Sequence, residues 1–245
     1  MRNSGTEKKM FTSGSVFTAE YWREAALQLA DVRMLCVAAV LIALRVALKS
    51  AKIPVGQDLN VQVGFFVNAL GASVFGPVMA IVGAAISDTL GALIDPSGGV
   101  YFFPFIIPEI AGSLIFALML WRQKLTGGRV ILSRFLVTFI SNLVLTPPIM
   151  IWYYAFLNNG KSYRLVTIPR IVKNLALFPM EALLLILFLE AMRVPLIKLN
   201  LVPKNQEKLI FTKKHIILLI ALFVAAAAFV LLYYFLFLPN KGLFK

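Results

Sequence analysis

The sequence predicts an all-α integral membrane protein with a bundle of six transmembrane helices and one extra C-terminal transmembrane helix. Hydrophobic residues make up 60% of the 245-residue chain, whereas soluble domains contain about 45–50%. They are gathered into runs, and a run of about 20 apolar residues is long enough to cross a bilayer. Basic residues lie mostly between these runs, which is typical of the charges that set membrane topology.

Each apolar run is interpreted as one membrane span. The second is short and carries the polar residues Gln62 and Asn68, and Gly76-Pro77 predicts a tight turn after it. Pro147-Pro148 should kink the fifth span because two backbone donors are missing there. The expected spans are Val32–Leu48, Val61–Phe75, Val78–Ile94, Phe103–Trp121, Ile131–Tyr154, Ile168–Val194 and Ile216–Leu238.

The domain organisation follows from these spans. Residues 1–30 hold no short apolar core followed by a cleavage site, so we expect a cytoplasmic tail with a short surface helix at Ala19–Ala30. The predicted segments after it are a six-helix core at 31–196, a basic linker at 197–215, an additional transmembrane helix at 216–238 and a tail at 239–245.

The distribution of basic residues predicts the orientation. With the N-terminus in the cytoplasm, 15 of the 24 Lys and Arg residues fall in inner segments, among them Arg134. This bias favours the N-inside topology.

Composition also restricts the chemistry. The only cysteine, Cys36, cannot form an internal disulfide, and the only histidine, His215, has no metal-ligand spacing around it. We expect no metal and no cofactor. The chain has no G-x-x-x-x-G-K-[ST] phosphate-binding loop, and we find no nucleophile with a base for an intramembrane enzyme.

Polar side chains at membrane depth are costly and usually functional. In the N-inside topology they gather near the outer ends of several helices, which predicts a shared cavity open to the exterior. Arg170, Lys173 and Asn174 follow an i, i+3, i+4 spacing on one helical face. A guanidinium, an ammonium and an amide side by side suit a carboxylate-bearing ligand. The predicted binding residues at this depth are Arg45, Asn68, Asp88, Arg170, Lys173 and Asn174.

Other interpretations of these residues stay open. Arg45 and Lys49 could reach outward to the lipid headgroups. Asp88 and Glu109 could pair with basic residues purely for packing, and Glu181 could be structural.

Two further patterns point to interactions. The loop before Pro104 carries Tyr101 and Phe103, which could stack on a flat ring or belong to an interfacial aromatic belt. In the first span Ala39, Ala43 and Ala47 recur at every fourth position, so another helix could approach closely, although ordinary internal packing explains the pattern equally well.

From Asp31 to Leu196 these features resemble the membrane-embedded S components of energy-coupling factor (ECF) transporters, and the folate-specific branch in particular. The motifs that carry the resemblance are the alanine stripe, Ser87-Asp88-Thr89-Leu90-Gly91, Pro96-Ser97-Gly98-Gly99 with Phe103-Pro104, Pro169-Arg170-Ile171-Val172-Lys173-Asn174 and Pro179-Met180-Glu181.

The resemblance implies a six-helix bundle in the plasma membrane of a bacterium that captures a vitamin from outside. It further implies that the alanine stripe meets a transmembrane coupling subunit carrying two cytoplasmic ATPases, and that the S component topples to release its ligand inward without hydrolysing ATP itself. The pterin of a folate would need an aromatic slot with Asp88 or Asn68, and its glutamyl tail would suit Arg170, Lys173 or Arg45.

The sequence departs from the family in its seventh span and in Glu109, where we expect a smaller or neutral residue. Another vitamin or a cationic ligand therefore remains an alternative. An intramembrane enzyme and a membrane assembly protein are the competing classes, and the second leaves the face of Arg170, Lys173 and Asn174 unexplained.

Overall fold

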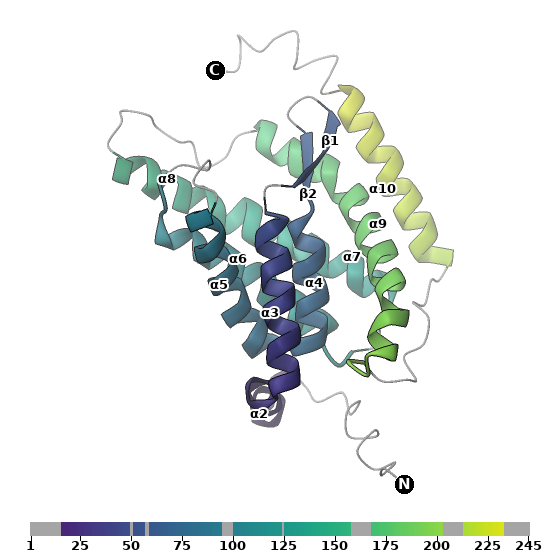
Figure 1. Cartoon of the computed structure of the whole chain (residues 1–245). Helices are drawn as coiled ribbons and strands as arrows, with labels where there is room; N and C mark the ends of the chain where they lie inside the picture. The colour runs from purple at the N-terminus through teal and green to yellow at the C-terminus, as the bar shows by residue number, and fades with distance from the viewer. Residues whose placement is uncertain are drawn as a thin grey trace.

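The computed structural model of the protein describes residues 16–49, 51–56, 59–94, 100–123, 125–157, 168–202 and 213–232. Within these ranges the chain is a helical bundle with one small hairpin (Figure 1). The elements are α2 (Ala19–Leu27), η1 (Gln28–Ala30), α3 (Val32–Ala47), β1 (Lys52–Gly56), β2 (Leu59–Gln62), α4 (Gly64–Phe75), α5 (Pro77–Ile94), η3 (Phe103–Phe105), α6 (Ile106–Leu120), α7 (Gly127–Leu136), η4 (Val137–Leu145), α8 (Thr146–Leu157), α9 (Ile168–Lys198) and α10 (Lys213–Leu232).

Several of these helices are long and apolar enough to cross a membrane. In the described part of the chain four stretches qualify, namely Pro77–Ile94, Phe103–Leu120, Gly127–Leu157 and Lys173–Lys198, and a fifth is added if α2 and α3 form one bent span. Helix α4 and the apolar part of α10 are shorter. The protein is therefore a multi-pass membrane protein by length and composition, and the count of six spans plus one stays a prediction.

The inner end of the bundle, as the sequence orients it, carries α2. This helix meets α3 at 83°, so it lies across the end of the bundle and not along it (Figure 1). Asp31 separates the two helices and caps α3, since its carboxylate accepts a hydrogen bond from the backbone N–H of Arg33 at 2.9 Å. Tyr21 packs edge-on against Trp121 with ring centroids 4.9 Å apart, which fixes α2 to the end of α6.

The predicted tight turn between the second and third spans is present at Gly76. Its φ of 82° is a left-handed conformation that favours glycine. A Cβ at this position would also lie 2.6 Å from the Trp121 ring, so only glycine allows this close packing.

The start of the second span was predicted too early. Residues Leu59–Gln62 form β2, which pairs antiparallel with β1, and the helix begins only at Gly64. Val61 is fully buried and packs against Leu177 of α9. The hairpin, which ends at Gln62, therefore lies at the end of the bundle opposite α2 (Figure 1).

The apolar core lies between α4, α6, α7 and α9. Phe116, Leu185 and Ile186 are among its most completely buried side chains. Helix α10 packs along α9 on the outside of the bundle (Figure 1), and its described side chains are exposed. Apolar side chains thus fill the half of the bundle nearer to α2, and polar side chains lie toward the opposite end.

A polar cavity at the predicted outer end

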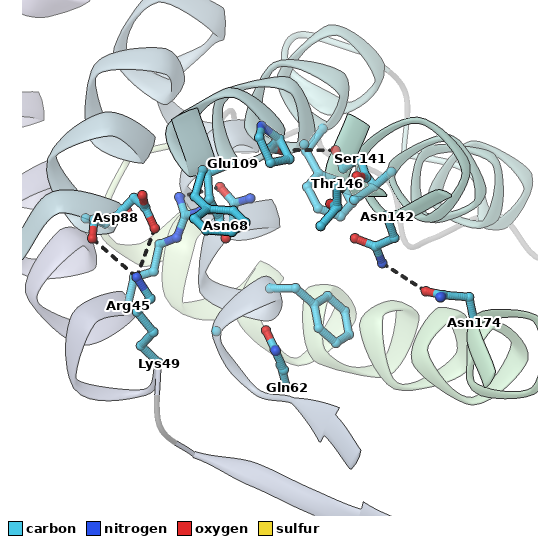
Figure 2. Close-up of a pocket in the computed structure, with 18 of the residues that line it drawn as sticks. Arg45, Lys49, Gln62, Asn68, Asp88, Glu109, Ser141, Asn142, Thr146 and Asn174 are labelled. Atoms are coloured by element: carbon cyan, nitrogen blue, oxygen red, sulfur yellow. Dashed lines mark hydrogen bonds and ion pairs between the residues drawn. The ribbon is translucent and has the colours of Figure 1, made fainter. Parts of the chain in front are cut away.

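The end of the bundle that the sequence predicts to face outward holds a cavity of about 630 Å³, within the size range of small-molecule sites. Residues from α3, α4, α5, α6, η4 and α9 line it, and Figure 2 shows their side chains converging from these helices. Seven of the eight predicted binding residues reach this cavity, namely Arg45, Asn68, Asp88, Tyr101, Arg170, Lys173 and Asn174. The shared cavity that the sequence predicted is therefore present.

On one wall Arg45 is held by polar groups from two neighbouring helices. Its guanidinium donates to Asn68 Oδ1 at 3.0 Å, to Ser113 Oγ at 3.3 Å and to the carboxylate of Glu109. The Arg45 side chain is only 14% exposed, whereas that of Glu109 is 42% exposed. Arg45 thus points into the bundle, so the alternative that it reaches the headgroups is wrong. Glu109, which was not among the predicted binding residues, presents a carboxylate to the cavity.

Next to it, Lys49 crosses the face of α5. Its ammonium donates to Asp88 Oδ1 at 2.9 Å and to the Asp88 carbonyl at 3.2 Å (Figure 2). Gly91 makes this path possible, because a Cβ there would lie 2.5 Å from Lys49 Cδ. The pair satisfies a carboxylate that is 8% exposed and ties α3 to α5 at the rim of the cavity.

The opposite wall is formed by α9 and η4. Residues 170, 173, 174, 177 and 181 of α9 all line the cavity, as the predicted helical face requires. Asn174 Oδ1 accepts a hydrogen bond from Asn142 Nδ2 at 3.1 Å (Figure 2), and Arg170 Nη2 donates to the carbonyl of Asn142 at 2.9 Å. Asn142 was missed by the sequence analysis, although a lone amide beside Pro147-Pro148 in an apolar span is a usable signal.

The floor of the cavity is a buried ion pair. Arg134 donates to Glu181 Oε2 from Nε at 3.1 Å and from Nη2 at 2.6 Å. The two residues are 5% and 7% exposed, and the guanidinium lies 4.1 Å from the centre of the Phe65 ring. Arg134 therefore lies inside the bundle and not in an inner loop, which corrects its place in the topology count. Glu181 has the structural contact that was considered for it and also lines the cavity.

The aromatic side chains are placed differently from the prediction. Phe103 is 69% exposed and lies outside the cavity lining, while Phe102 and Phe105 face the cavity. Tyr101 also lines it, and its hydroxyl lies 3.3 Å from Thr89 Oγ1. The helical turn η3 begins at Phe103 and brings Phe105, two residues later, to the cavity. No pattern in three consecutive aromatic residues indicates which of them faces inward.

The cavity has an excess of positive charge. Its described lining contains five basic and three acidic residues. Each of the three carboxylates binds a basic side chain of the lining. Arg170 and Lys173 both belong to the α9 wall. No group of three His, Cys, Asp or Glu residues in the described ranges could hold a metal ion. The site is suited to an organic anion with polar groups at its other end.

The alanine stripe lies on the outer surface of α3. Ala39, Ala43 and Ala47 are all exposed, whereas Ala38 on the opposite side is buried against α4 and α5. The alternative of ordinary internal packing is therefore wrong for these alanines, and the stripe is available to another membrane helix.

A helical membrane bundle with a polar cavity near one end defines a small-molecule-binding membrane protein. Residues 33–189 match the family model described as ECF transporter, substrate-specific component. The chain belongs to this family, as the sequence motifs implied, and the family is one of transport components. Helices α2 and α10 lie outside the matched residues.

Relatives named as folate transporters agree with this membership. The chain is 29% identical over 127 residues to the folate transporter FolT of Clostridium novyi (strain NT), an alignment covering 52% of this chain and 70% of the relative. It is 30% identical over 154 residues to the folate transporter FolT of Leuconostoc mesenteroides subsp. mesenteroides, covering 62% and 81%. A crystal structure of FolT bound with folic acid has a TM-score of 0.52 and 27% identity, covering 62% of this chain and 88% of that one. The resemblance to the folate branch is thereby confirmed.

Proposed function

We propose that this protein is the substrate-binding membrane subunit of an ECF-type importer and that it captures folate, or a related pterin vitamin, from outside the cell. The observation that carries the proposal is the cavity with two cations on its α9 wall and paired carboxylates on the facing wall. Folate has a glutamyl tail with two carboxylates, which matches the formal excess of two positive charges. The relatives named folate transporters support the same substrate.

The two ends of the ligand would meet different walls. Arg170 and Lys173 bind the glutamyl carboxylates, with Asn174 donating or accepting alongside them. The pterin presents several N–H groups, which suit the carboxylates of Glu109 and Asp88 on the facing wall. Tyr101, Phe102 and Phe105 supply the aromatic surface for a flat ring. In this assignment Arg45 and Asn68 orient Glu109.

Transport requires partners. The exposed face of Ala39, Ala43 and Ala47 fits close packing by the transmembrane coupling subunit. Two ATPase subunits bound to that coupling subunit hydrolyse ATP, and the S component topples in the plasma membrane to deliver the vitamin inward. The family membership supports these partners.

The test is a direct binding measurement. The full chain is purified in detergent, co-purifying small molecules are identified by mass spectrometry, and folate affinity is measured for wild type, Arg170→Ala and Lys173→Ala. Both variants should lose at least about tenfold in affinity, since a charged hydrogen bond contributes about 1.5–3 kcal/mol. Lys213→Ala, on the exposed start of α10, is the control and should bind as wild type does.

The position of Glu109 gives the alternative substrate a specific basis. A carboxylate 42% exposed at the cavity also suits a ligand with a cationic ring. Recovery of a different vitamin by mass spectrometry would support this alternative, and unchanged folate affinity in both α9 variants would contradict the assignment of the α9 wall.

A further inference from the structure

The fifth span changes its hydrogen-bond register beside the cavity. Residues Val137–Leu145 form a π-helix, in which each backbone N–H bonds to the carbonyl five residues earlier and not four. At its end the N–H of Thr146 bonds to the carbonyl of Ser141, and the Thr146 hydroxyl donates to the same oxygen at 2.5 Å. Ser141 and Asn142 from this segment line the cavity.

This register leaves the carbonyl of Asn142 without a helical donor. In an α-helix the N–H of Thr146 would bond to it, but that N–H bonds to Ser141. In the π register the donor would be residue 147, and Pro147 has no N–H. A backbone carbonyl at membrane depth must be satisfied from elsewhere. Arg170 does so, since its Nη2 lies 2.9 Å from this oxygen.

The same carbonyl fixes where the guanidinium stands. Arg170 has a long side chain with several rotatable bonds, so the direction of its charge depends on what holds it. The bond to Asn142 directs it across the gap between α9 and η4, and the neighbouring bond from Asn142 Nδ2 to Asn174 Oδ1 joins the same two elements. Asn174 Nδ2 in turn donates to the Arg170 carbonyl at 2.9 Å.

We propose that Pro147 is a positioning residue for ligand binding: by withholding a backbone N–H in the π register, it keeps the Asn142 carbonyl available to anchor Arg170 toward a ligand carboxylate. The proposal rests on the proposed function of Arg170 as a carboxylate-binding group. The proposal gives Pro147 a role beyond bending the helix. Pro148 does not share this role, because only Pro147 stands five residues after Asn142.

The adjacent proline supplies a matched control. Pro147→Ala restores an N–H that can bond to the Asn142 carbonyl and compete with Arg170. Pro148→Ala restores an N–H that would bond to residue 143 in the π register or 144 in the α register, so it leaves Asn142 unchanged. Because Pro147 is buried and Pro148 exposed, each change is repeated in an Arg170→Gln background, where packing losses persist but the anchoring effect cannot.

Folate dissociation constants of the detergent-purified full chain decide the question. Pro147→Ala should weaken binding roughly three- to tenfold, as expected for one hydrogen bond, and Pro148→Ala less than about twofold. In the Arg170→Gln background Pro147→Ala should have no further effect. Equal losses in the two proline variants, or the same loss from Pro147→Ala in both backgrounds, would overturn the proposal.

A second readout needs no ligand. In a structure of ligand-free Pro147→Ala, the Arg170 guanidinium should have left the Asn142 carbonyl, and a contact still within about 3.2 Å would overturn the proposal. If wild type does not bind folate, the proposed substrate is refuted, and the ligand-free structure still decides the role of Pro147.

Discussion

Breaking the buried ion pair at the cavity floor should destabilise the protein strongly. Arg134 is only 5% exposed in the wild-type fold. In Glu181→Leu its guanidinium loses hydrogen bonds of 3.1 and 2.6 Å to one carboxylate oxygen and keeps only the Phe65 ring as a weak partner. Removing one partner of a buried pair costs about 3–5 kcal/mol. For a chain of this size that loss corresponds to a fall in Tm of roughly 10 °C.

The assay is thermal unfolding of the detergent-purified protein, followed by circular dichroism. The double variant Arg134→Met/Glu181→Leu removes both charges and should recover most of the lost stability, because apolar replacement of a buried pair is often neutral. Glu24→Gln is the control, since its pair with Arg122 is partly exposed and should contribute less than about 1 kcal/mol. A single variant as stable as the double variant would refute the reasoning.

Three further predictions concern other parts of the molecule. Gly91→Ala should displace Lys49 from Asp88 and lower folate affinity severalfold, whereas Gly83→Ala, where a Cβ would lie 3.5 Å from its neighbours, should bind normally. Ala43→Leu should reduce co-purification with the coupling subunit without changing folate affinity, and a parallel loss of both would contradict a separate docking face. Burial raises the pKa of Tyr21 to about 12, so Tyr21→Phe should remove one late-titrating phenol from an absorbance titration. Because the pKa of the phenol is higher in the folded than in the unfolded chain, its contribution to folding stability is present below pH 10 and is lost as pH rises toward 12.

Much of the fold and part of the site could be predicted from the sequence, because lipid imposes costs that leave a direct record in composition. Apolar runs mark helices, since only helices satisfy the backbone within a bilayer. The face of Arg170, Lys173 and Asn174 followed from helical spacing alone, and these residues do share one cavity wall. Charged side chains at membrane depth indicated a cavity because facing lipid would be costly.

The particular contacts were decided only by the tertiary structure. Sequence spacing does not reveal whether Arg45 reaches outward or bonds to Asn68 and Glu109, because that depends on how α3 is rotated against α4 and α6. The start of the second helix was missed because β2 pairs with β1 in a hairpin and its Val61 packs against Leu177 of α9, and these contacts override the apolar pattern.

The sequence by itself determined that this chain crosses a membrane as helices and carries polar groups at one depth, since those properties follow from the free energy of placing each residue in lipid. Only the tertiary structure decided that Phe102 and not Phe103 faces the cavity and that Asn142 receives Arg170. The physical reason is that a helical turn η3 and a π register in η4 rotate side chains by fractions of a turn, and these rotations depend on packing and hydrogen-bond partners far away in the sequence.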